Sequence, residues 1–185
     1  MKKYLKDDII DILIVLGVLA VGLFVFVGHQ GHMLIDNGRE VYFPVEVLKG
    51  KVLYKDIFNI YGPLSYQVNA LLYFIFGQRL SSLYLGGIVS SITIIMSLFL
   101  ITKEVATSRI SKAVSYFIIA ACVCNSYIFN FVFPYSYAVS YSLASFMAAL
   151  LFLVYYIKTD HKNFVFVSAF WQACHWLLNM NIPCF

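Results

Sequence analysis

The sequence predicts an all-α protein: a polytopic transmembrane helical bundle in which an external loop carrying juxtamembrane helices follows the first span. Of the 185 residues, 62% are hydrophobic and 12% are charged, whereas an average globular domain has about 25% charged residues. So little charge cannot cover the surface of a soluble domain. Several apolar runs also approach the roughly 20 residues that a helix needs to cross the hydrocarbon core. Most of the polar residues that could carry chemistry lie in one loop, 28–81.

Five stretches are predicted to span the membrane within one domain, 1–185. The first four contain no Asp, Glu, Lys or Arg except Asp11, and the fifth contains His175. The first stretch is predicted to be an uncleaved signal anchor, because a signal peptide has a shorter apolar core and a small-residue cleavage site. The predicted spans are 9–27, 82–101, 113–131, 138–157 and 163–178.

Two helices of the external loop are predicted to lie along the membrane surface, at about 38–49 and 64–76. The second segment has 13 residues, which is too short to span, so it fits an interfacial helix. Pro63 suits the first turn of that helix, where a missing N–H costs nothing. Its apolar positions recur at helical spacing and are Leu64, Val68, Leu71, Leu72 and Ile75.

The distribution of Lys and Arg predicts the orientation of the chain. If 64–76 does not cross the membrane, the segments 1–8, 102–112 and 158–162 share one side and hold eight of the 13 basic residues. The positive-inside rule assigns that side to the cytoplasm. The sequence therefore predicts a multi-pass protein of the plasma (inner) membrane with a cytoplasmic N-terminus and the bilayer as its first partner.

The acidic residues of the external loop are the candidates for chemistry. A carboxylate at the interface can act as a general base when its pKa suits the task, and a nearby Lys or Arg can hold a phosphate. The alternative is a solvated loop with ordinary surface ion pairs. The sequence has no clustered basic face for nucleic acid, and its four cysteines match no zinc pattern. The loop carboxylates are Asp36, Glu40, Glu46 and Asp56.

A set of short motifs appears in a fixed order along the loop. The acidic motif is Asp36-Asn37-Gly38-Arg39-Glu40, and an apolar-Gly-Tyr-Lys-Asp stretch follows over 48–56. Tyr61-Gly62-Pro63-Leu64 and Phe74-Ile75-Phe76-Gly77 stand at the start and end of the second surface helix. Over residues 9–157 this order resembles the GT-C class of membrane glycosyltransferases, in particular bacterial protein O-mannosyltransferases and aminoarabinose transferases.

The resemblance implies transfer of a sugar from a polyprenyl-phosphate donor to an acceptor of unspecified kind on the outer face of the membrane. It implies that Asp36 is the catalytic base, and that Arg39 or Lys55 stabilises the departing phosphate. Asp56 would orient the acceptor or a divalent metal, although no cofactor is assigned because members of the class differ in metal need. The substrate-binding candidates are Arg39, Glu40, Lys55, Asp56 and Tyr61.

Two departures from the family pattern lead to further expectations. Asn37 stands where many relatives have a second acid, and the chain ends after a fifth span where the family has about seven. The expectation is therefore such a glycosyltransferase or an N-terminal fragment of one. The alternatives are a non-catalytic transporter or flippase component and an inactive truncation product. Transporters usually place ionisable residues or broken helices at mid-membrane, and the first four predicted spans have neither at that depth.

Overall fold

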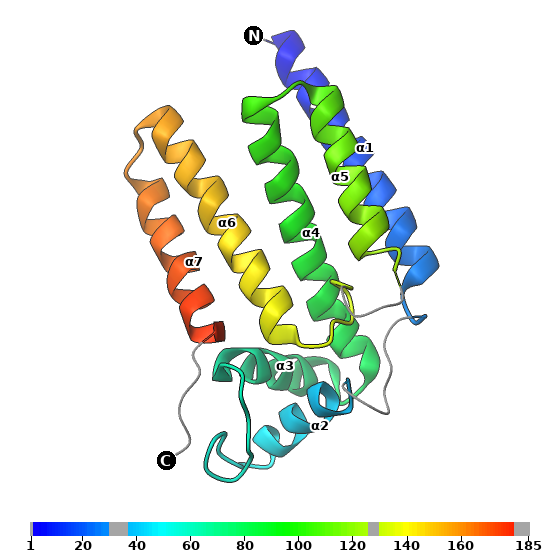
Figure 1. Ribbon diagram of the computed structural model, residues 1–185, viewed down its shortest axis with the longest axis vertical. Helices are drawn as coiled ribbons and strands as arrows, with labels where there is room; N and C mark the ends of the chain where they lie inside the picture. Colours follow the sequence, from blue (N-terminus) through cyan, green and yellow to red (C-terminus); the bar gives the residue numbers. More distant parts are fainter. Residues whose placement is uncertain (1, 30–36, 126–129, 180–185) are drawn as a thin grey trace.

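The computed structural model describes residues 2–29, 37–125 and 130–179. The described residues form seven helices and no strand, which confirms the prediction of an all-α protein. Figure 1 shows their arrangement. The helices are α1 (Lys2–Phe26), α2 (Asn37–Leu48), α3 (Pro63–Phe76), α4 (Leu80–Val105), α5 (Ser108–Cys122), α6 (Tyr137–Thr159) and α7 (Asn163–Asn179).

Five helices run lengthwise beside one another, and α3 lies across one end of this bundle with α2 beside it (Figure 1). Within the bundle α7 packs on α6, α6 on α4, α4 on α5, and α5 on α1. Helix α3 contacts α4, α6 and α7. Helices α2 and α3 therefore form a layer over the end of the bundle, and we call this the juxtamembrane layer.

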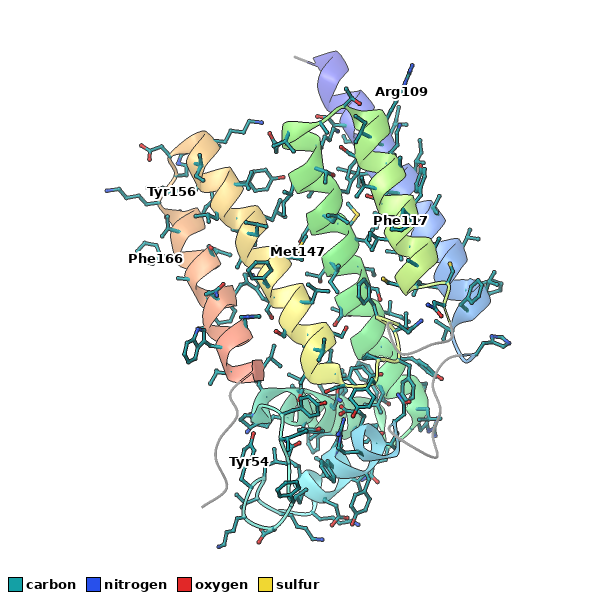
Figure 2. The ribbon with its side chains drawn as sticks, in the orientation of Figure 1. Tyr54, Arg109, Phe117, Met147, Tyr156 and Phe166 are labelled. Atoms are coloured by element: carbon teal, nitrogen blue, oxygen red, sulfur yellow. The ribbon has the colours of Figure 1, made fainter. Side chains whose placement is uncertain are left out.

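The interior of the bundle combines small buried serines with large apolar side chains such as Leu19 and Phe99, and its outer surface is also apolar. Buried Ser90 and Ser91 donate their hydroxyls to the carbonyls of Gly86 and Gly87, one helical turn earlier. A Cβ on Gly87 would overlap the backbone of Val132, so glycine allows close contact there. The outer faces carry large exposed side chains such as Phe24 of α1 (89%), Phe117 of α5 (70%) and Phe166 of α7 (75%); Figure 2 shows Phe117 and Phe166 on the outer sides of the bundle. Small residues at helix contacts, together with apolar side chains on the outer faces, are typical of helices packed in lipid.

Within the described ranges, three helices are long and apolar enough to cross a membrane: Asp8–Phe26, Leu80–Val105 and Tyr137–Thr159. Helices α5 and α7 have 15 and 17 residues. At about 1.5 Å per residue, α5 rises about 22 Å, less than the roughly 30 Å of the hydrocarbon core. Its described helical part therefore differs from the span predicted at 113–131.

Two asparagine side chains form hydrogen bonds with backbone groups at and beyond the end of α5. The amide of Asn125 donates to Ala121 O (3.2 Å), and that of Asn130 donates to Val123 O (3.2 Å). The Asn130 carbonyl accepts the N–H groups of Val132 and Phe133 at 2.7 and 3.0 Å. Such side-chain bonds offer the backbone an alternative to the helix. Hydropathy does not register this effect, which explains why the run looked continuous in the sequence.

Ion pairs join the helices at the end opposite the juxtamembrane layer. Asp8 of α1 pairs with Lys103 of α4 (2.6 Å), and Asp11 of α1 pairs with Lys112 of α5 (2.6 Å). Helix α1 begins at this end, where α4 turns into α5 and α6 turns into α7 (Figure 1). The three segments with most of the basic residues thus lie at one end of the molecule.

Candidate functional site

The juxtamembrane layer is positioned by glycines and prolines at the ends of its helices. Pro63 is the first residue of α3, and a Cβ on Gly62 before it would overlap the end of α7. Gly77, with φ +88°, follows the last residue of α3, as is common for glycine at helix ends. Helix α2 continues through Pro44 from Asn37 to Leu48. Gly62 therefore allows the start of α3 to pack directly against α7, and Gly77 allows the chain to turn from α3 into α4.

An adjacent arginine and glutamate occupy the centre of this layer. Glu40 is completely buried, and its Oε1 accepts hydrogen bonds from Arg39 Nη2 (3.2 Å) and from the Tyr66 hydroxyl (3.1 Å). Its Oε2 accepts the backbone N–H of Tyr137 at 3.3 Å. Tyr137 is the first residue of α6, so Glu40 also binds the positive end of that helix. One carboxylate thus joins α2, α3 and α6.

The guanidinium of Arg39 contacts two aromatic rings. Its Cζ lies 4.8 Å from the centroid of Tyr61 and 5.4 Å from that of Tyr135. The Arg39 side chain remains 24% exposed, unlike that of Glu40. Stacking on tyrosine orients a guanidinium without using its outward N–H groups. Arg39 is therefore held in place and still reaches the surface, where it can bind an anion.

Burial changes the protonation of this cluster. Desolvation raises the pKa of Glu40, while the charge of Arg39 and the hydrogen bonds from Tyr137 and Tyr66 oppose that rise. Burial also raises the pKa of Tyr61, as does neighbouring Tyr135. Burial raises the pKa of Tyr66, and the negative charge of Glu40 adds to that effect. Tyr61 and Tyr66 are therefore neutral hydroxyls that can donate or accept a hydrogen bond.

Glu46, a second carboxylate of α2, is buried and pairs with two exposed lysines. Glu46 pairs with Lys49 at 2.7 Å and also with Lys51. Hydrogen bonds from Lys49 and Lys51 lower the pKa of Glu46 to about 2. Glu46 is therefore ionised at neutral pH and already bound by two cations.

The structure unites some of the predicted site residues and separates others. Arg39, Glu40 and Tyr61 belong to one cluster. Lys55 and Asp56 lie on an exposed turn, where Asp56 Oδ2 accepts the N–H of Val52 (2.9 Å). Within the described ranges, no hydrogen bond or ion pair joins either residue to Arg39 or Glu40. Asp36, the predicted catalytic base, lies outside the described residues.

The first residue of α2 links the site to the segment before α6. Asn37 is buried, and its Nδ2 donates to Pro134 O at 3.0 Å. Asn37 directly follows Asp36 in the chain. The backbone next to the predicted base is therefore fixed to the same 130–136 segment that supplies Tyr135 to the arginine.

An apolar groove of about 490 Å³ lies beneath the juxtamembrane layer, between α3, α4, α6 and α7. Leu64, Val68 and Leu72 of α3 form its upper wall, and Phe170 and Trp171 of α7 form one side. A cavity of about 150 Å³ holds a benzene molecule, so this groove has room for a much longer hydrocarbon. The groove and the Arg39–Glu40 cluster share helix α3.

Sequence reasoning missed several residues of the cluster. Tyr66 and Tyr135 complete it. A signal for Tyr66 was present, because the side chains that α3 buries recur at helical spacing opposite its apolar positions. These buried residues are Ser65, Tyr66, Asn69, Ala70 and Tyr73.

Within the described ranges, no group of three His, Cys, Asp or Glu side chains lies close enough together to hold a metal ion. Comparison with protein-family models, with curated proteins and with solved structures gives no significant match.

Proposed function

We propose that this chain is a multi-pass membrane protein of the GT-C type, which acts in transfer of a sugar from a polyprenyl-phosphate donor on the outer face of the membrane. One observation carries the proposal: α3 lines an apolar groove and also holds, through Tyr66 and Glu40, a partly exposed arginine. A polyprenyl-phosphate sugar combines a long hydrocarbon with an anionic head. The groove suits the first part and the guanidinium suits the second.

The proposed reaction uses two residues at the start of α2. Asp36 would take the proton from the acceptor nucleophile as that group attacks the anomeric carbon. The bond from that carbon to the phosphate oxygen breaks, and polyprenyl phosphate leaves as an anion. Arg39 would stabilise the charge that develops on this leaving group. Glu40 would act as a positioning residue, because its oxygens already bind Arg39, Tyr66 and Tyr137.

The proposed orientation has a direct test by cysteine labelling. Thr107 is exposed between α4 and α5, and Ser81 is exposed near the start of α4 at the other end of the bundle. In a chain without its native cysteines, Thr107→Cys should resist a membrane-impermeant maleimide on intact cells, and Ser81→Cys should react. Labelling of Thr107→Cys from outside, or protection of Ser81→Cys in a correctly inserted protein, would show that the orientation is wrong.

The role of Arg39 predicts weaker binding of the lipid phosphate. Purified full-length protein in nanodiscs is titrated with polyprenyl phosphate, the part common to all such donors. Arg39→Ala is expected to lower the affinity at least about tenfold, because a charge-assisted hydrogen bond contributes about 1.5–3 kcal/mol. Arg79→Ala removes another exposed cation of the same loop and is the matched control.

Arg39→Lys serves as a second variant, because alanine also leaves Glu40 without its cation. Lysine keeps the charge but loses the planar contact with Tyr61 and Tyr135, so intermediate affinity is expected. Equal affinity of wild type and a folded Arg39→Ala variant would contradict the proposed role. So would an equal loss with Arg79→Ala, because the effect would then reflect only the charge of the loop.

A further inference from the structure

A small slot lies beside the first turns of α6, separate from the groove under α3. Its volume is about 190 Å³. The segment before α6 contributes Phe131 and Pro134 to its walls, and α6 contributes Val139 and Leu143. Val139 is 57% exposed, so the slot opens on the outer side of α6. Most of the wall is therefore hydrocarbon, and the opening faces the surroundings of the bundle.

One hydroxyl in this slot lacks a partner. Ser136 is 1% exposed, and its Oγ has no hydrogen-bond partner among the residues that the structure describes. A serine at this position before a helix usually accepts an N–H of the first turn, but Val139 N–H donates to the backbone carbonyl of Ser136 instead (3.2 Å). The hydroxyl therefore keeps an unused donor at a buried position in the wall of the slot.

The other polar side chains of the slot are already bound, including Tyr135, whose hydroxyl forms a hydrogen bond with that of Tyr61. Ser140 Oγ donates to Phe131 O at 3.2 Å. The side chain of Asn130 donates to Val123 O and accepts the N–H of Val132. The slot therefore presents one unsatisfied donor surrounded by apolar walls, and a complementary ligand carries an oxygen acceptor on a hydrocarbon chain.

The apolar walls favour a neutral acceptor over an anion. The Glu40 carboxylate accepts the N–H of Tyr137, the residue after Ser136, and the Arg39 guanidinium over Tyr135 is paired with that same carboxylate. The two charges largely cancel, so a phosphate would gain little from them and would have to lose its water against apolar walls. An ester carbonyl carries no net charge and is followed directly by a hydrocarbon chain.

We propose that this slot binds an acyl ester of a membrane glycerolipid. The Ser136 hydroxyl donates to the ester carbonyl, and the first methylenes of the acyl chain pack on Val139 and Leu143. Helix α6 is one of the helices long and apolar enough to cross a membrane, so its end lies near the depth at which glycerolipid esters occur. The inference is independent of sugar transfer, because a polyprenyl phosphate has no such ester.

Ester and ether lipids provide the test. The purified full-length protein is loaded with a phosphatidylglycerol that has two acyl chains, or with its dialkyl ether analogue of equal chain length, and retained lipid is measured by native mass spectrometry. Wild type should retain the diacyl lipid about fivefold better, because the ether has no carbonyl to accept the hydrogen bond.

Serine variants identify the donor. Ser136→Ala should retain both lipids equally, whereas Ser136→Thr, which keeps the hydroxyl, should preserve the preference. Ser91→Ala is the control, since that buried hydroxyl bonds the carbonyl of Gly87 inside α4. Equal retention of the two lipids by wild type, retention of neither, or a preference that survives in Ser136→Ala would overturn the proposal. If a variant fails to fold, the comparison of diacyl and ether lipid retention by the wild-type protein still tests the proposal.

Discussion

Asp36→Asn is expected to abolish sugar transfer while the chain still inserts into the membrane and binds polyprenyl phosphate. Asparagine has nearly the shape of aspartate but cannot take a proton from the acceptor. General-base catalysis contributes about 10²–10⁴-fold to a rate, so at most about 1% of the activity should remain. Binding of the lipid phosphate should change little, because that step is assigned to Arg39 and the groove.

The measurement compares transfer and binding in the same preparation. Membranes with each variant receive polyprenyl-phosphate-linked sugars, transferred sugar is quantified, and polyprenyl phosphate affinity is measured separately in nanodiscs. Glu104→Gln is the matched acid-to-amide control, because Glu104 pairs with Lys158 at the opposite end of the bundle. Undiminished transfer by Asp36→Asn would exclude Asp36 as the base. Wild type that binds polyprenyl phosphate but transfers no sugar under any condition would favour the non-catalytic alternative.

Glu40→Ala is expected to destabilise the folded protein by about 3 kcal/mol. The change leaves the guanidinium of Arg39, the hydroxyl of Tyr66 and the N–H of Tyr137 without their shared acceptor. Removal of one partner from a buried ion pair costs about 3–5 kcal/mol, and the partial exposure of Arg39 favours the lower value. Glu40→Gln keeps an acceptor oxygen for Tyr66 and Tyr137, so a loss of about 1 kcal/mol is expected.

The raised pKa of Glu40 predicts a pH dependence with a definite sign. The folded state binds the Glu40 proton more readily than the unfolded state, whose value is near 4.5. The contribution of this carboxyl to stability is therefore fully present below about pH 4.5 and is lost as pH rises through the folded pKa. Glu46 acts in the opposite direction. Its folded pKa is about 2, so its contribution is present above pH 4.5 and is lost only as pH falls below that value.

Melting temperatures measured as pH falls from 8 separate these two carboxyls, because the contribution of Glu40 to stability increases as pH falls toward 4.5, whereas that of Glu46 is constant above pH 4.5. Wild type should gain stability relative to Glu40→Gln as pH falls, and Glu46→Gln should keep the wild-type trend. A constant difference between wild type and Glu40→Gln would show that Glu40 does not change protonation. A melting temperature of Glu40→Ala equal to that of wild type would remove Glu40 from its role in joining α2, α3 and α6.

Helix positions were largely predictable because long apolar runs and turn residues are local signals. The predicted 64–76 and 38–49 segments correspond to α3 and α2, and 82–101 and 138–157 fall within α4 and α6. The prediction for 113–131 was less accurate, since the amides of Asn125 and Asn130 bind carbonyls at and beyond the helix end. An average hydropathy does not report where one side chain donates a hydrogen bond.

The sequence by itself determined the all-α class and the loop with most of the candidate residues, and three of its five predicted spans are described helices with the length and composition to cross a membrane. Only the tertiary structure decided that Arg39 is stacked on Tyr61 and Tyr135, that Glu40 is buried against Tyr66, and that the Ser136 hydroxyl has no partner among the described residues. Hydropathy and periodicity act within one segment, and so they can be read from the chain. The contacts of Arg39 with Tyr135 and of Glu40 with Tyr137, the latter pair 97 positions apart, join distant parts of the chain. Such residues meet only when the helices pack.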